Sequence, residues 1–125
     1  MHSLATNIKN IIDLDETIRI IGTADDTEQV LALFIESLPL TKQEFELAFI
    51  DYNVEQLRAL CHKLKGSTAY CITPNLTNQL TIFHELLRNS SEDQQSIQYA
   101  YLQLVASLDE LAQTLSMLSI PKKIS

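Results

Sequence analysis

Apolar residues recur every three or four positions along most of the chain, which is the spacing of amphipathic helices. The first such stripe consists of Leu4, Ile8, Ile11, Leu14, Ile18 and Ile21. Gly22 ends this stripe, because glycine commonly follows the last turn of a helix. Asp13 and Asp15 interrupt the run and allow a second short helix to begin there. In that case residues 1–12 would form a loose amino-terminal extension.

A second apolar face consists of Val30, Leu33, Phe34 and Leu38, followed by Phe45, Ala48 and Phe49. We expect its helix to begin at Asp25, which has a glutamate three positions later in the pattern of a capping box. Pro39 interrupts this face, because proline disfavours helix at the preceding residue, and Thr41 with Glu44 offers another capping box. The pattern predicts either one kinked helix to about Ile50 or two helices in succession.

Two further helices follow in the middle of the chain. Asn53 and Gln56 resemble the cap of the first, which we expect to run to about Cys71. Thr73 and Pro74 then restart the chain in the preferred order of a cap followed by proline. The apolar positions of the second helix are Leu76, Leu80, Phe83 and Leu87.

The last helix has the most regular apolar pattern. We expect it to begin at a capping box of Ser91 and Gln94. Its heptad positions are Ile97, Tyr101, Leu104, Leu108, Leu111, Leu115 and Leu118. Such a stripe serves either a coiled coil with a partner chain or the interior of a bundle, and we favour the bundle because other amphipathic stretches can bury it. Pro121 ends the helix, and residues 119–125 form a tail.

Short turns between long amphipathic helices predict antiparallel neighbours. We therefore expect an all-α fold, an antiparallel up-and-down four-helix bundle with an additional amino-terminal helix. Only two glycines and three prolines among 125 residues suit helices joined by short turns better than a sheet. A chain of this length forms one domain, residues 1–125, and we expect it to be a monomer.

The charge of the chain limits its partners. A formal net charge of −7 argues against nucleic acid, which is bound by basic surfaces, and against an anionic membrane. No apolar run approaches the roughly 20 residues that a membrane span needs. The first residues, Met1-His2-Ser3-Leu4, lack the charged and apolar regions of a signal peptide, so we place the protein in the cytoplasm.

The spacing of apolar residues predicts that the reactive side chain of His62 lies on the surface. At about 100° per residue, the positions within roughly 40° of the pole opposite His62 are Leu57, Leu60, Leu64, Ser67 and Cys71. Arg58, Lys65, Gly66 and Ala69 lie within about 60° of His62 instead. His62 should therefore point to solvent from a flat, positively charged surface.

Two observations favour a function for this surface over an ordinary solvated face. Glycine in an exposed helix interior costs about 1 kcal/mol relative to alanine, so Gly66 indicates close approach by another molecule. No carboxylate occurs between Gln56 and His84, and Lys63 and Lys65 flank this site in an otherwise acidic chain. Such a local excess of positive charge suits an anion held at His62.

The remaining cysteines and histidines have simpler interpretations. Cys61 and Cys71 are ten residues apart, which is about 15 Å on one helix, so they should be small core or flank residues without a mutual disulfide. Cys61, His62 and His84 lack the paired spacing of metal ligands, and we expect no metal site. His84 lies beside an apolar stripe, so we expect a partly buried ring with an ordinary hydrogen bond.

The helix around His62 contains the run His62-Lys63-Leu64-Lys65-Gly66-Ser67, followed by Thr68-Ala69-Tyr70 and Pro74. This run resembles the signature of histidine-containing phosphotransfer (HPt) domains, which are four-helix-bundle phosphocarriers of multistep two-component relays. The resemblance covers about residues 13–118 and is greatest to the carboxy-terminal HPt domain of tripartite hybrid sensor kinases. Many members carry glycine where Ile72 stands and glutamate where His84 stands.

The resemblance implies a role for each residue of the motif. His62 corresponds to the phosphorylated histidine, which reacts through Nε2, Lys65 to the basic neighbour and Gly66 to the small residue, while Ser67 completes the motif. His62 would accept a phosphoryl group from a receiver-domain aspartate of a hybrid kinase and pass it to an aspartate of a response regulator. An imidazole of ordinary pKa, near 6.5, is mostly unprotonated at neutral pH and so is a competent nucleophile.

The other residues of the surface would assist this reaction. Lys65, with Arg58 and Lys63, would offset the phosphoryl charge. We expect the docking surface for the receiver to consist of Arg58, Lys63, Gly66, Ser67 and Ala69. The chain has no glycine-rich phosphate loop and no acidic metal cluster, so we expect no ATP-dependent kinase activity and no cofactor. In the family the magnesium ion belongs to the receiver.

Two alternatives belong to other functional classes. In a non-catalytic adaptor bundle, His62 and Gly66 would be incidental. In a hydrolase, His62 would be the nucleophile, although no second acid or base accompanies it on its face of the helix.

Overall fold

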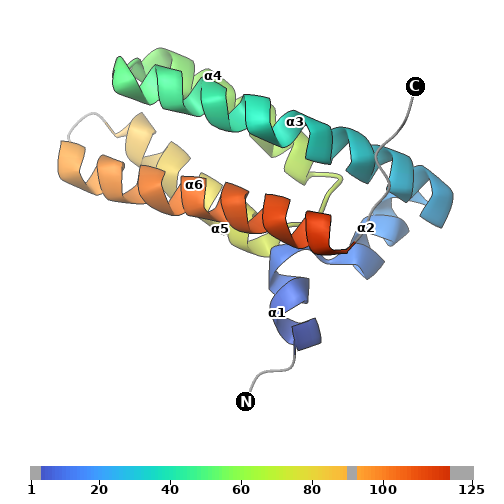
Figure 1. Cartoon of the computed structure of the whole chain (residues 1–125). Helices are drawn as coiled ribbons and strands as arrows, with labels where there is room; N and C mark the ends of the chain where they lie inside the picture. Colours follow the sequence, from blue (N-terminus) through green and yellow to red (C-terminus); the bar gives the residue numbers. More distant parts are fainter. Residues whose placement is uncertain (1–3, 90–92, 119–125) are drawn as a thin grey trace.

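The computed structural model describes residues 4–89 and 93–118, and the regular structure in these ranges is entirely α-helical. Its helices are α1 (Leu4–Ile11), α2 (Leu14–Ile21), α3 (Ala24–Ile50), α4 (Val54–Thr68), α5 (Pro74–Arg88) and α6 (Gln94–Met117). The four long helices pack as a bundle in which α4 contacts α3 and α5, and α6 contacts α5 and α3 (Figure 1). The predicted all-α bundle is confirmed. The amino-terminal addition consists of two short helices, with α1 against α5 and α6, and α2 against α3.

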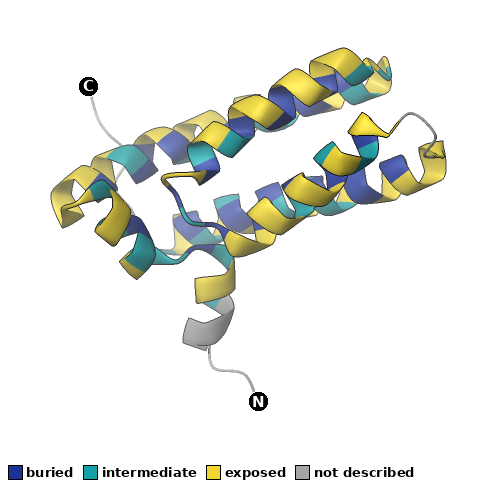
Figure 2. Ribbon diagram, turned by 180° about the vertical axis from the view of Figure 1, so that it is seen from behind, coloured by how far each residue is buried: buried dark blue, intermediate teal, exposed yellow. Residues whose placement is uncertain are grey.

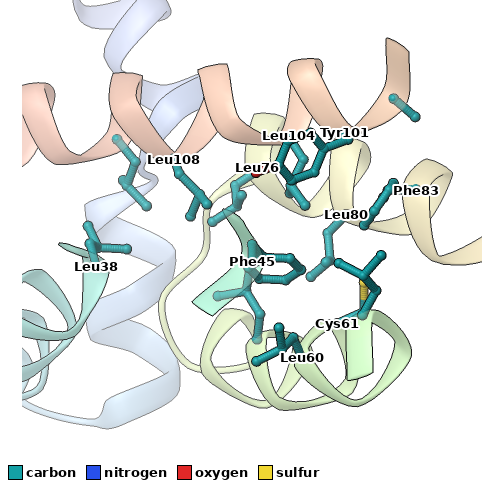
Figure 3. Close-up of a cluster of buried hydrophobic side chains, with 14 of the residues drawn as sticks. Leu38, Phe45, Leu60, Cys61, Leu76, Leu80, Phe83, Tyr101, Leu104 and Leu108 are labelled. Carbon is teal, nitrogen blue, oxygen red and sulfur yellow. The ribbon is translucent and has the colours of Figure 1, made fainter. Parts of the chain in front are cut away.

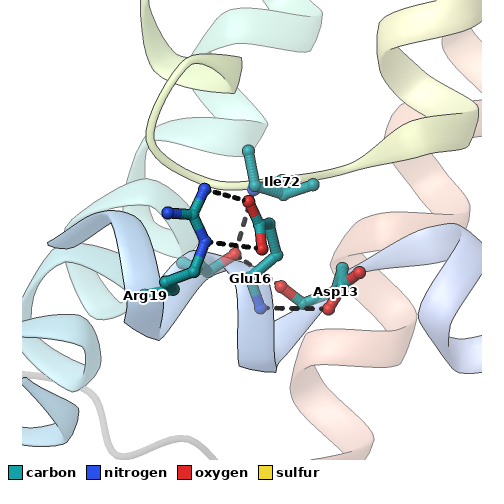
Figure 4. A network of polar contacts seen from close by, with 5 residues as sticks. Asp13, Glu16, Arg19 and Ile72 are labelled. Carbon is teal, nitrogen blue, oxygen red and sulfur yellow. Dashed lines mark hydrogen bonds and ion pairs between the residues drawn. The ribbon is translucent and has the colours of Figure 1, made fainter. Parts of the chain in front are cut away.

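The junction between α1 and α2 is bound to the turn that follows α4. The Asp13 side chain caps α2 by accepting a hydrogen bond from the backbone N–H of Glu16, as the interrupted stripe allowed. The Asp13 N–H donates to the Ile72 carbonyl at 2.8 Å, and the Ile72 N–H donates to the Thr17 hydroxyl at 3.0 Å (Figure 4). Ile12, immediately after α1, is 1% exposed and belongs to the core.

Helix α3 differs from the sequence prediction at its start and in its middle. It begins one residue before Asp25, because the Thr23 hydroxyl accepts the hydrogen bond from Asp26 N–H and so caps the first turn. Pro39 lies inside a single helix, and Thr41 is an interior residue. Burial of Leu38 and Phe45 on either side of Pro39 offsets the hydrogen bond that proline removes.

The apolar face of α3 is also narrower than expected. Leu33, which the sequence assigned to this face, has an exposed fraction of 55%. Leu31 and Phe34 are buried, and Leu33 lies about 160° and about 100° from them, respectively, around the helix. Leu33 therefore falls outside the stripe that these two residues define.

The boundaries of the later helices are partly as predicted. Asn53 caps α4 by accepting from Gln56 N–H at 3.0 Å, and Thr73 followed by Pro74 begins α5, which confirms both starts. Helix α4 ends at Thr68, before Cys71, because the chain turns there to reach α2. The cap of α6 is Asp93, which accepts from Ser96 N–H. The predicted cap Ser91 and the terminator Pro121 lie outside the described residues.

The core lies between the inner faces of the long helices, where the buried positions gather (Figure 2). The heptad positions of α6 from Ile97 to Leu115 are buried, which confirms that this stripe faces the bundle interior, and Leu118 is partly buried. They pack with Leu76, Leu80 and Phe83 of α5 and with Phe45 of α3 (Figure 3). Among the described residues, no helix is long and apolar enough to span a membrane.

Candidate functional site

His62 lies on the outer face of α4, exposed to solvent. Leu57, Leu60 and Leu64 of the same helix are buried in the core, as the helical wheel predicted. Ser67 is only half-buried, because it lines a groove between α3 and α4. The core packing of α4 therefore fixes the direction of His62 without covering its ring.

Two basic residues occupy the side of α4 that faces α5. Arg58 donates two hydrogen bonds, from Nε at 3.1 Å and from Nη2 at 2.5 Å, to the Leu87 carbonyl in the last turn of α5. A cation at this position satisfies an end carbonyl and complements the negative end of the helix dipole. Lys65 is half-buried on the same side and acts electrostatically on His84 of α5. These contacts place positive charge between the two helices, next to His62.

Lys63 lies on the opposite side of α4. Its Nζ is 3.9 Å from a carboxylate oxygen of Glu44 on α3, and it remains largely exposed. The positive charge of Lys63 is therefore partly balanced, while no carboxylate lies within ion-pair distance of Lys65 among the described residues. The two lysines serve different surfaces although they are separated by one residue.

The region beyond His62 on α4 is open. Gly66 and Ala69 are both exposed. A Cβ atom added at Gly66 would meet no heavy atom within 4 Å apart from its own helix. Internal packing thus gives no reason for glycine at this position.

His84 belongs to the site, although the sequence interpretation treated it as a flanking residue. Its ring is half-buried, as expected, but the Nδ1 atom is buried without a hydrogen-bond partner among the described residues, so the ordinary hydrogen bond predicted for it is wrong at this nitrogen. His84 lines a hollow with Arg58 and Arg88. No local pattern in the sequence indicates this hollow, because Arg58 comes from a different helix than His84 and Arg88.

The environment of His84 disfavours its charged form. Burial is the main cause that lowers its pKa, and the positive charges of Lys65 and Arg88 lower it further. His62 contributes in the same direction, and Glu85 opposes them. The site therefore contains a neutral imidazole surrounded by cations.

The thiol beside His62 in the sequence is not part of this surface. Cys61 points into the core, and burial raises its pKa to about 12. Cys71 is also buried and unbonded, with a pKa raised to about 11 for the same reason. Both thiols are therefore poor nucleophiles, because the thiolate is the reactive form. In the described part of the chain, no three His, Cys, Asp or Glu side chains gather closely enough to hold a metal ion.

Comparison with known proteins identifies the family. The family model described as Hpt domain matches residues 29–114, which include most of α3 and α6 and all of α4 and α5. The chain belongs to the Hpt domain family, whose members are histidine phosphotransfer modules of phosphorelays. No solved structure matches the chain.

Similar curated proteins carry one name. The signal transduction histidine-protein kinase BarA of Escherichia coli K12 is 26% identical over 95 residues, which are 76% of this chain and 10% of that protein. BarA of E. coli O157:H7 and of Shigella flexneri match with the same identity and coverage. The chain spans about a tenth of the length of these relatives.

Proposed function

We propose that His62 is the phosphoacceptor of this Hpt domain, taking a phosphoryl group from an aspartate of one receiver domain and passing it to an aspartate of a response regulator. The observation that carries the proposal is the exposed imidazole on α4, with Lys65 and the hollow of Arg58, His84 and Arg88 beside it. An acceptor must be both reachable and surrounded by positive charge, and of the residues described here His62 meets both conditions.

The chemistry requires little beyond position and charge. A lone pair on the His62 imidazole forms a bond to phosphorus while the bond between phosphorus and the aspartyl oxygen breaks, and the aspartate leaves as a carboxylate. The reverse sequence returns the phosphoryl group to a second aspartate. Lys65 and Arg58 offset the negative charge on the phosphoryl oxygens in both directions.

The open surface around His62 supports docking of a folded partner. Gly66 and Ala69 present almost no side chain, so a receiver can approach the imidazole closely. Lys63 and Ser67 extend this surface toward α3. We propose that the domain acts as a cytoplasmic monomer, uses no cofactor of its own, and relies on the magnesium ion of the receiver. It would act as a carrier, without ATP-dependent kinase activity.

The adaptor interpretation has less support. A purely structural bundle does not require glycine at an exposed interior position of a helix, where alanine would be more stable. It also does not require an exposed histidine beside unbalanced positive charge.

The deciding experiment is incubation of the chain with a phosphorylated receiver, followed by mapping of the label. We expect acid-labile phosphate on His62 and no label on the His62→Gln variant. Label on His2 or His84, or persistent labelling of His62→Gln, would show that the acceptor is another residue. Absence of any label across the receivers of the source organism would favour the adaptor.

A further inference from the structure

The hollow between α4 and α5 is built around one titratable group. Arg58, His84 and Arg88 line it. The Nδ1 atom of His84 is enclosed and has no hydrogen-bond partner in the described structure. Because Nδ1 is closed to solvent, Nε2 is the nitrogen at which the ring can exchange a proton with solvent or meet a ligand.

The groups facing His84 are known from both helices that form the hollow. On α4 they are His62, Lys65 and the Arg58 guanidinium, and on α5 they are Arg88 and Glu85. Arg58 is held by the Leu87 carbonyl, and Arg88 lies 3.6 Å from the Glu85 carboxylate. Arginine keeps its charge at every physiological pH. His84 is therefore the member of this group whose charge can respond to a change at His62 near neutral pH.

Phosphorylation of His62 would reverse the electrostatic balance at His84. In the bare site, burial and the positive charges of Lys65 and Arg88 lower the pKa of His84, while the Glu85 carboxylate opposes them. A phosphoryl group carries nearly two negative charges near neutral pH. Because Arg58, one turn before His62 on α4, lines the hollow together with His84, an anion on His62 would lie near this hollow and favour the imidazolium form of His84.

We propose that His84 takes up a proton at Nε2 when His62 is phosphorylated, and that the resulting imidazolium donates a hydrogen bond to the phosphoryl group and retains it on His62. This inference rests on the proposed function of His62. Its consequence is a pH dependence of the carrier. By linkage, a proton bound together with the phosphoryl group makes the phosphorylated form more favourable as the pH falls, by at most about tenfold per pH unit.

The direct test uses the whole chain and phosphoramidate, a small donor that requires no partner protein. A nitrogen of His62 forms a bond to phosphorus while the P–N bond of the donor breaks. The nitrogen of the donor takes up the proton that the imidazole loses and leaves as ammonia. The ring nitrogens of His84 are then followed by ¹⁵N NMR through the neutral pH range, before and after phosphorylation. We expect the titration midpoint of His84 to move to higher pH in the phosphorylated form.

The possible outcomes separate the two hypotheses. If His62 is phosphorylated but His84 titrates identically in both forms, the inference is overturned and the proposed function stands. If neither phosphoramidate nor a phosphorylated receiver labels His62, the proposed function itself fails.

A second measurement compares the lifetime of phosphohistidine in the wild type, His84→Gln and Arg88→Gln. Glutamine can still donate a hydrogen bond but cannot take up a proton. The ratio of wild-type to His84→Gln lifetimes should rise as the pH falls. Arg88→Gln removes a charge that lowers the pKa of His84, so proton uptake in this variant should move to higher pH. A constant ratio for both variants would contradict proton uptake by His84.

Discussion

The two sides of α4 differ in the balance of positive and negative charge, although both border the same histidine. On the α5 side, Arg58, Lys65 and His84 gather near a single carboxylate, Glu85. On the α3 side, Lys63 faces Glu44 in a groove whose edge carries exposed Leu40. The α5 side has an excess of positive charge that suits an anion, whereas the α3 side is balanced in charge and partly apolar. We infer that the α5 side stabilises the phosphoryl group and that the α3 side contributes mainly to docking.

This difference arises from a rotation of about 100° per residue along one helix. Lys63 is one position from His62 in the sequence and Lys65 is three, yet they point away from each other across α4. Proximity in sequence is therefore a poor guide to function on a helix, and the tertiary neighbour of each side chain decides its role.

The largest expected effect is that of His62→Gln, which removes the proposed acceptor, the residue that both sides share. Glutamine has similar helix propensity at this exposed position, so the melting temperature should stay within the small range of surface substitutions. Phosphoryl acceptance should be lost completely. Circular dichroism melting and labelling by a phosphorylated receiver measure the two properties, and residual labelling would count against the assigned acceptor.

Gly66→Gln should have the next largest effect, because it obstructs docking while leaving both charged sides intact. The new side chain has free space within the domain and relieves a glycine penalty, so stability should hold or rise by up to about 1 kcal/mol. Misplacement of the reacting atoms by about 1 Å can cost roughly a hundredfold in rate. We expect transfer from a receiver to slow by that order.

Phosphoramidate provides the control for Gly66→Gln, since this small donor does not need the open surface. Its reaction with His62 should change little. Equal slowing with both donors would mean that the substitution disturbs His62 itself, and unfolding of the variant would mean that Gly66 is required for packing.

Lys65→Ala compared with Lys63→Ala tests the contrast between the two sides directly. Lys65 lies on the side with unbalanced positive charge, so its loss should slow phosphoryl transfer by about tenfold without abolishing it. Lys63 is exposed and pairs with Glu44, so its loss should change the rate about twofold or less. Rapid-quench measurement of transfer from one receiver gives both rates. Equal effects would remove the distinction between the sides.

The smallest effect concerns stability and pH. Because the folded state lowers the pKa of His84, the unfolded chain binds more protons at this residue than the folded chain does. His84 should therefore destabilise the fold as the pH falls below about 6.5, its ordinary pKa. Urea unfolding at neutral and mildly acidic pH should show that His84→Gln loses less stability on acidification than the wild type. A larger loss would mean that the imidazolium is favoured in the folded protein.

Local periodicity was enough to predict the bundle and the exposure of His62. The heptad of α6 and the wheel of α4 depend on residues within two turns of each other, and the structure buries the predicted stripes. The starts of α3 and α6 were predicted incorrectly because several residues near each start can act as an N-cap. At α3, the path of the preceding turn decides whether Thr23 or Asp25 caps the helix.

The role of His84 was beyond the reach of such patterns. His84 is 22 positions from His62 in the sequence, and only the packing of α4 against α5 brings the two rings into the same electrostatic environment. The unpartnered Nδ1 atom is likewise a product of tertiary enclosure. No spacing rule within one helix predicts either property.

The hydrogen bond between Thr17 and Ile72 joins residues that are 55 positions apart. With α3 and α4 folded, this bond and its neighbours hold only two short helices near the end of the chain against the bundle. The amino-terminal helices are therefore expected to detach as a cooperative unit at a lower free energy than the bundle unfolds. The α4–α5 surface, whose two helices are consecutive in the chain, would stay folded during such an opening. Transient detachment of the amino-terminal helices would therefore not prevent the proposed phosphoryl transfer through His62.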